Sequence, residues 1–169
     1  MRIGYADPPY PSCAHLYKDH PDYDGEVDHA ELIDRLERDY DGWILHSSST
    51  SIPLIVPMLP DGVRTMAWVK PFCAFKRNVS VAYAWEPVYV KACRKPRVTK
   101  RVVMRDFFSH GIMMKKGLTG AKPPKLVEWL IEVVGAELGD ELHDMYPGTG
   151  IVEQTWLEWV AARESEDKP

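Results

Sequence analysis

A short apolar run that ends in two prolines constrains the fold of this chain more than any other feature. Residues 1–6 (MRIGYA) read as a buried strand, and residues 7–10 (DPPY) follow it directly. Proline has no N–H to donate within a central strand, so the strand must end here and the chain must turn. Ligands of open α/β sheets bind at the carboxyl ends of the strands. We therefore expect Asp7 at a ligand-binding edge.

Apolar periodicity predicts alternating strands and helices along the rest of the chain. Further strands are expected over 43–46, 64–69, 86–91 and 141–144, helices over 29–40, 126–134 and 151–163, and a broken helix over 51–59. Residues 11–25 and 92–120 read as loops, and 164–169 as a polar tail. These elements predict one three-layer α/β domain over 1–169 with an open, mostly parallel sheet.

Size and composition agree with a single soluble domain. The chain has 169 residues, of which 45% are hydrophobic and 27% charged. No apolar run reaches the roughly 18 residues of a membrane span, and the start of the chain does not resemble a secretory signal. The cysteines, Cys13, Cys73 and Cys93, are far apart and have no zinc-like spacing. We therefore expect a cytoplasmic protein with reduced thiols, no membrane partner and no metal.

Positive charge is concentrated in one part of an acidic chain. The net charge of −4 disfavours nonspecific binding of polyanions by the whole surface. Between 91 and 116, however, many basic residues are opposed only by Asp106: Lys91, Arg94, Lys95, Arg97, Lys100, Arg101, Arg105, Lys115 and Lys116. This asymmetry fits a polyanion-binding face, and it also fits a solvated charged loop.

A glycine turn near the other end of the chain provides a second candidate site. Residues 144–150 (DMYPGTG) lie between the predicted strand over 141–144 and the last predicted helix. Glycines let the backbone approach a ligand closely, and the start of a helix presents N–H groups to a carboxylate. The alternative is a glycine turn that merely caps the helix.

The two segments together resemble one enzyme family. Residues 7–10 are similar to the DPPY motif of S-adenosylmethionine-dependent methyltransferases that modify the exocyclic amine of adenine, or N4 of cytosine. Residues 144–150 resemble the D-x-F/Y-x-G-x-G signature of their cofactor site. Residues 120–123 (GAKP) resemble the segment that precedes the cofactor strand, and 85–88 (WEPV) a strand with a Glu after the catalytic half. This order is that of the circularly permuted class of DNA amino-methyltransferases, which is shared by relatives that act on RNA adenines.

The resemblance implies catalytic roles for Asp7, Pro8, Pro9 and Tyr10. The amine of adenine is a poor nucleophile because its lone pair is delocalised into the ring. The Asp7 carboxylate can accept a hydrogen bond from one amino proton, and the Pro8 carbonyl can accept one from the other. The prolines fix these acceptors, and Tyr10 offers a flat face to an unstacked base. The methyl group would then transfer directly, in line.

The resemblance also implies the binding residues. S-adenosylmethionine is expected to contact Ala6, Asp7, Lys122, Pro123, Asp144, Met145, Tyr146, Gly148 and Gly150. Nucleic acid is expected to contact Arg94, Lys95, Arg97, Lys100, Arg101 and Arg105. We further expect the catalytic and cofactor strands to be adjacent at the centre of the sheet.

The chain departs from the family at its end. In the full family fold, two more strands follow the helix after the glycine turn, and the first normally ends in an acidic residue that binds the ribose. The resemblance therefore implies a compact, phage-like form of the Rossmann-like methyltransferase fold, permuted and truncated after this helix. The expected activity is methylation of adenine N6 in DNA. The alternatives are cytosine N4, RNA adenine, or a non-catalytic nucleic-acid-binding subunit. A homodimer or a partner subunit that completes the site also stays open.

Overall fold

A six-stranded sheet forms the middle layer of the computed structural model, which describes residues 1–18, 25–73, 79–95, 103–113 and 121–166. The strands are β1 (Arg2–Ala6), β2 (Gly42–His46), β3 (Arg64–Val69), β4 (Trp85–Lys91), β5 (Phe107–Ser109) and β6 (Glu141–Asp144), in the spatial order β5-β3-β4-β2-β1-β6. β1 pairs in parallel with β2 and β6, and β3 with β5, whereas β4 is antiparallel to β2 and β3. Every strand but β4 therefore runs the same way, which confirms the open, mostly parallel sheet.

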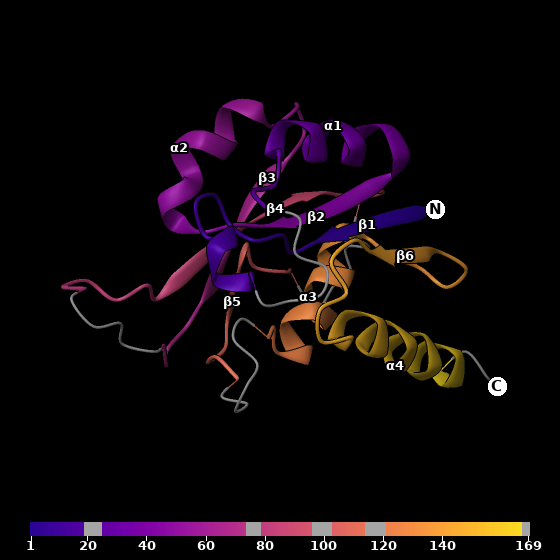
Figure 1. Ribbon diagram of the computed structural model, residues 1–169. Coiled ribbons are helices and arrows are strands. Elements are labelled where there is room, and N and C mark those ends of the chain that lie inside the picture. Colours follow the sequence, from indigo (N-terminus) through magenta and orange to yellow (C-terminus); the bar gives the residue numbers. More distant parts are fainter. Residues whose placement is uncertain (19–24, 74–78, 96–102, 114–120, 167–169) are drawn as a thin grey trace.

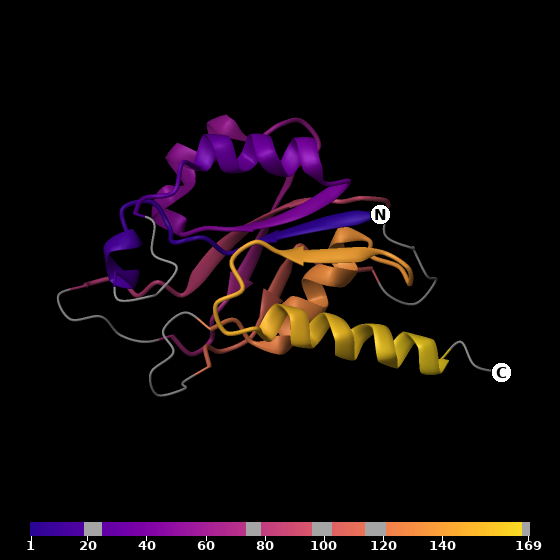
Figure 2. The ribbon, with the colours of Figure 1, turned by 45° about the vertical axis from the view of Figure 1, so that its right-hand side comes forward.

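Helices cover both faces of this sheet, as Figures 1 and 2 show. α1 (His29–Asp39) and the short α2 (Ile52–Ile55) lie on one face, and α3 (Pro124–Val134) and α4 (Ile151–Glu166) on the other. Alternate residues of a strand point to opposite faces, so each face has its own core. Trp43 and Leu45 pack on the α1 side, and Ile44 packs on the α3 side. The prediction of three layers is confirmed.

The sequence dictates where the main helices begin and end. The Asp28 carboxylate caps α1 by accepting hydrogen bonds from the N–H groups of Ala30 and Glu31. Gly135 ends α3 with a left-handed φ of 82°, and a Cβ there would lie only 2.6 Å from the carbonyl oxygen of Arg94. A glycine is therefore required at this turn.

Three details differ from the expectations. A strand, β5, forms within the range 92–120 that was predicted to be a loop. It forms because its three residues pair with β3 and Phe108 stacks on Trp129 of α3. α4 continues through Glu166, beyond the predicted end, and Arg163 in its last part pairs with Glu132 of α3. β6 is adjacent to β1 as expected but lies at the edge of the described sheet, not at its centre.

The short helices near the sheet edge include 3-10 turns at Ala14–Tyr17, Ser49–Ser51 and Val56–Met58. The last two flank α2, so the broken helix expected over 51–59 is confirmed. Across the ranges that the structure describes, no helix is both long and apolar enough to cross a membrane.

Candidate active site

The DPPY segment and the glycine turn begin side by side at the carboxyl edge of the sheet. Tyr5 of β1 is paired in register with Asp144 of β6. The N–H of Met145 then donates to the carbonyl of Tyr5 at 2.9 Å, so the two chains stay together beyond the last pair. Asp7 follows Tyr5 by two residues, and the turn that carries Gly148 follows Asp144. The predicted adjacency of the catalytic and cofactor strands is confirmed.

Lys122 connects the start of α3 to the DPPY segment. Its Nζ donates to Asp7 Oδ1 at 2.7 Å and to the Tyr10 hydroxyl at 3.2 Å. Lys122 is buried, as is Pro123, which caps α3, whereas Asp7 is half-buried. A buried ammonium is stable only when it is paired and hydrogen-bonded. The contact with Asp7 therefore both stabilises Lys122 and fixes one oxygen of the Asp7 carboxylate.

Glu86 of β4 anchors Tyr10 from the other side. The Tyr10 hydroxyl donates to Glu86 Oε2 at 2.8 Å, and Lys70 Nζ donates to Glu86 Oε1 at 2.7 Å. Burial opposes the ionised form of Glu86, but the ammonium groups of Lys122 and Lys70 outweigh it and lower the pKa of Glu86. Asp7, Tyr10, Glu86 and the two lysines thus form one charge-balanced network that sets the position of the Tyr10 ring.

Trp68 of β3 forms an apolar wall against which both lysines lie. The Lys70 ammonium is 5.2 Å from the centre of the Trp68 ring, and the Lys122 ammonium 5.9 Å from it. Cation–π attraction acts at such distances. The indole N–H donates to the His110 carbonyl at 2.8 Å, which fixes the ring.

A buried tyrosine–histidine pair lies beside this network. The Tyr5 hydroxyl and His46 Nε2 are 2.7 Å apart, and both side chains are fully buried. Burial raises the pKa of Tyr5, and Asp7 and Asp144 raise it further. Burial also lowers the pKa of His46, as does the nearby Lys122 ammonium. The pair is therefore uncharged at neutral pH.

Asp144 has one oxygen that fits a ligand. Oδ1 accepts a hydrogen bond from the N–H of Tyr146 at 3.1 Å, whereas the buried Oδ2 has no partner among the described residues. Burial raises the pKa of Asp144 to about 6, and Asp7 and Glu153 act in the same direction. A buried acceptor without a donor is costly unless a ligand supplies one.

The turn after Asp144 leaves room for such a ligand. Gly148 and Gly150 have left-handed φ values of 37° and 70°, which disfavour other residues. A Cβ on Gly150 would meet no heavy atom within 4 Å, and one on Gly148 only the Tyr146 carbonyl at 3.7 Å. α4 begins at Ile151 and points its first N–H groups toward this turn. The residues present fit an amino acid, with Asp144 for its ammonium and the turn for its carboxylate.

Other predicted cofactor and catalytic residues surround this edge. Ala6 and Pro8 are buried, and Pro9 is half-buried. Met145 and Tyr146 pack against the core on the α1 side.

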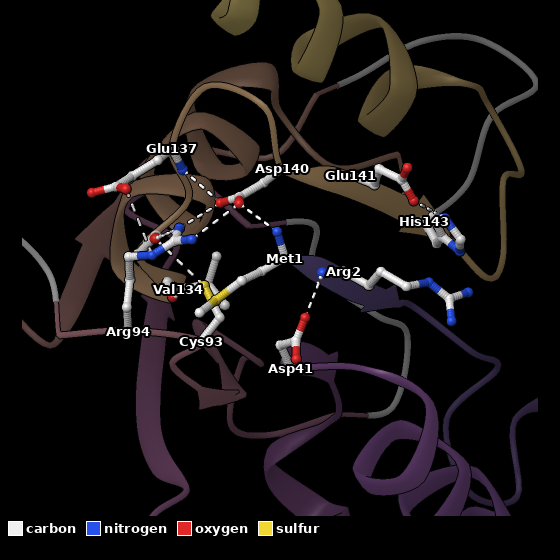
Figure 3. A network of polar contacts seen from close by, with 11 residues as sticks. Met1, Arg2, Asp41, Cys93, Arg94, Val134, Glu137, Asp140, Glu141 and His143 are labelled. Atoms are coloured by element: carbon white, nitrogen blue, oxygen red, sulfur yellow. Dashed lines mark hydrogen bonds and ion pairs between the residues drawn. The ribbon is translucent and has the colours of Figure 1, made fainter.

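Those predicted nucleic-acid residues that the structure describes lie in different parts of the fold. Arg94 lies at the opposite edge of the sheet from Asp7, because it follows β4, whose last residue pairs with the start of β2. Its guanidinium donates to Asp140 Oδ2 at 2.5 Å and to the Gly135 carbonyl at 2.7 Å (Figure 3). The α-amino group of Met1 also donates to Asp140, at 2.7 Å. Arg94 thus forms an ion pair within the fold, and its contact with phosphate stays a prediction.

The other predicted contacts are more dispersed. Lys95 is exposed, and the Arg105 guanidinium lies 5.6 Å from the centre of the Phe107 ring at β5. Arg97, Lys100 and Arg101 lie outside the described residues. The structure thus separates Arg94 from Arg105 and leaves the middle of the basic segment as a prediction.

Sequence reasoning did not assign Lys70 or Glu86 to the site. The register of the antiparallel pair places Glu86 opposite Trp68, and Lys70 follows on the same face. Side chains two apart on a strand share a face. The signal that could have indicated Lys70 was therefore a lysine two positions after the buried Trp68, at the end of the strand.

Comparisons with known proteins address the fold. No protein-family model matches the chain, and none of the curated proteins does. The chain is similar to the crystal structure of the M1.HpyAVI-SAM complex, with a TM-score of 0.62 and 20% identity over 94% of this chain and 78% of that one. It is also similar to a crystal structure of M1.HpyAVI with a TM-score of 0.55 and 14% identity over 94% and 75% of the two chains. The chain thus has a Rossmann-like methyltransferase fold.

Proposed function

We propose that this chain methylates an exocyclic amine of a nucleic-acid base with S-adenosylmethionine, and that adenine N6 in DNA is the target. The observation that carries the proposal is the register of Tyr5 with Asp144, which brings Asp7 beside the glycine turn. The shared methyltransferase fold supports it, because the similar M1.HpyAVI structure is a complex with SAM.

The cofactor would be held by the edge that carries Asp144. The Asp144 oxygen that has no described partner suits the ammonium in the amino-acid part of the cofactor. The turn with Gly148 and Gly150, together with the start of α4, suits the carboxylate of the cofactor. When bound, S-adenosylmethionine supplies an electrophilic methyl group.

The chain's own residues would then activate the amine. Lys122 occupies Asp7 Oδ1 and so presents the second carboxylate oxygen to an amino proton. The Pro8 carbonyl accepts a hydrogen bond from the other amino proton, and the neighbouring proline ring limits backbone motion. Acceptors that are fixed in advance help the nitrogen to become tetrahedral without reorganisation. Tyr10, held by Glu86, supports the base by stacking.

The same acceptors would serve cytosine N4 or an RNA adenine, so the experiment must distinguish the substrates. The purified chain is incubated with S-adenosylmethionine labelled in its methyl group and, separately, with adenine-rich DNA, cytosine-rich DNA and RNA. The proposal predicts that label enters adenine-containing DNA. Transfer to another substrate would select that alternative. Nucleic-acid binding without S-adenosylmethionine binding, measured by calorimetry, would select the non-catalytic subunit.

A further inference from the structure

The chain between β3 and β4 exposes an unusual set of apolar side chains. Phe72 is 56% exposed, Val81 76%, Tyr83 41% and Trp85 40%, and Val79 is also exposed. We call Phe72, Val79, Val81, Tyr83 and Trp85 the apolar strip. The last four belong to the uncharged sequence VSVAYAW over 79–85. Large apolar side chains that gather on a surface mark a binding site.

The apolar strip lies beside the candidate active site. Trp85 directly precedes Glu86, whose carboxylate accepts the hydrogen bond from Tyr10. The N–H of Lys70 donates to the Ala84 carbonyl at 2.7 Å. The chain after β3 and the chain before β4, which carry the strip, therefore leave the sheet together. They leave at the carboxyl end of β3, which is the edge that also carries Asp7. Figures 1 and 2 show the chain before β4 extending out from the body of the molecule.

The local charge favours a polyanion as the occupant. Residues 71–85 contain two basic residues, Lys76 and Arg77, and neither Asp nor Glu, although the whole chain has a net charge of −4. Basic residues interleaved with aromatic ones are the chemistry of single-strand nucleic-acid binding, in which bases stack on the rings. An apolar surface that only met another protein would not need this local excess of positive charge.

We propose that the apolar strip binds unpaired bases next to the base that enters the active site. The inference rests on the proposed function. A base that leaves a duplex exposes its neighbours and its former partner, and only unstacked bases offer a face to an aromatic ring. Tyr83 and Trp85 are two residues apart, where the chain enters β4 at the edge of the sheet that carries Asp7, so they are placed to stack such bases.

The test measures binding of a fluorescein-labelled oligodeoxythymidylate by fluorescence anisotropy. Tyr83→Ala and Trp85→Ala should each weaken binding at least about 5-fold, because stacking of a base contributes on this scale. Trp85→Phe should retain most of the affinity. Leu157→Ala is the matched control, since Leu157 is 61% exposed on α4, and it should bind like the wild type. The slope of log affinity against log salt should stay the same in all variants, because stacking releases no counterion.

Two results would overturn the inference. One is wild-type affinity for the oligonucleotide in Tyr83→Ala. Tyr83 lies outside the strands, so this variant remains informative if Trp85→Ala fails to fold. The other is a wild-type dimer, seen by sedimentation velocity, that Tyr83→Ala dissociates, since the strip would then join two copies. Calorimetry with S-adenosylmethionine separates this inference from the proposed function. A wild type that does not bind the cofactor counts against the function, whereas oligonucleotide affinity alone decides the role of the strip.

Discussion

Lys122 and Asp7 are 115 positions apart in the sequence, yet Lys122 Nζ donates to Asp7 Oδ1 at 2.7 Å. This contact joins the start of α3 to the end of β1 and couples the stability of the fold to the proposed catalytic group. Because Lys122 is buried, its ammonium needs the Asp7 carboxylate both to balance its charge and to hold it in position.

Replacement of Asp7 should therefore affect two quantities. Asp7→Asn should reduce methyl transfer more than about 100-fold, since an ionised acceptor is lost at the reacting nitrogen. It should also lower the free energy of unfolding by about 2 kcal/mol, since the Lys122 ammonium loses its carboxylate. Asp7→Asn combined with Lys122→Met should recover part of the stability but none of the activity. Equal stability of the single and double variants in urea unfolding would refute the coupling.

Gly148→Val should abolish S-adenosylmethionine binding in calorimetry. The branched side chain would stand in the turn that the ligand must approach, at a residue with a left-handed φ of 37°. Gly62→Val is the matched control, since Gly62 has a φ of 86°, no heavy atom within 4 Å of a built Cβ, and no part in the site. It should cost stability but keep cofactor affinity. Wild-type cofactor affinity in Gly148→Val would place the cofactor elsewhere.

Asp144 should make stability depend on pH between about 4 and about 6. Its folded-state pKa of about 6 lies above the ordinary value of 3.8. The folded state therefore holds the proton more tightly than the unfolded state, and this contribution to stability falls as pH rises from about 4 to about 6. Asp144→Asn should flatten the dependence of the unfolding free energy on pH in that window. An unchanged dependence in the variant would contradict this assignment.

The same carboxyl should link cofactor binding to pH. The ammonium of the cofactor favours ionised Asp144, so affinity for S-adenosylmethionine should rise as pH increases through about 6. Calorimetry in buffers of different ionisation enthalpy should detect a proton released on binding below that pH. Asp144→Asn should remove the release, and a release that persists would assign it to another group.

Arg94 should contribute to stability rather than to DNA binding. Arg94→Ala removes the guanidinium partner of the Asp140 carboxylate, which is only 4% exposed and keeps its contact with the Met1 α-amino group, and should cost about 2 kcal/mol of unfolding free energy. The slope of log DNA affinity against log salt should not change. Replacing Lys100 and Arg101 with Ala should instead make that slope shallower by about two units if both contact phosphates. A shallower slope in folded Arg94→Ala would return Arg94 to the DNA interface.

Local patterns predicted most of the fold, and contacts between distant residues explain what they missed. β1 was predictable because its apolar run ends at two prolines, and α1 because its apolar residues repeat with the period of a helix. β5 has three residues, too few to show a period, and its pairing with β3 decides its conformation. The ion pair of Arg94 was not predicted by a count of charges, because the sequence does not reveal its partner Asp140, 46 positions away.

The candidate site likewise divides into residues that belong to local motifs and residues that only contacts between distant parts of the chain bring together. Asp7, Tyr10, Lys122 and Asp144 belong to short motifs and were predicted. Lys70 was not predicted, because its role arises only when β3 and β4 pair and bring it to Glu86.

Mass spectrometry of nucleosides tests the central claim most directly. DNA is incubated with S-adenosylmethionine and either the wild-type chain or Asp7→Asn, then digested to nucleosides. The account predicts N6-methyldeoxyadenosine with the wild type and at least about 100-fold less with the variant. The absence of any methylated nucleoside with a folded wild-type chain, or equal amounts with both chains, would contradict it.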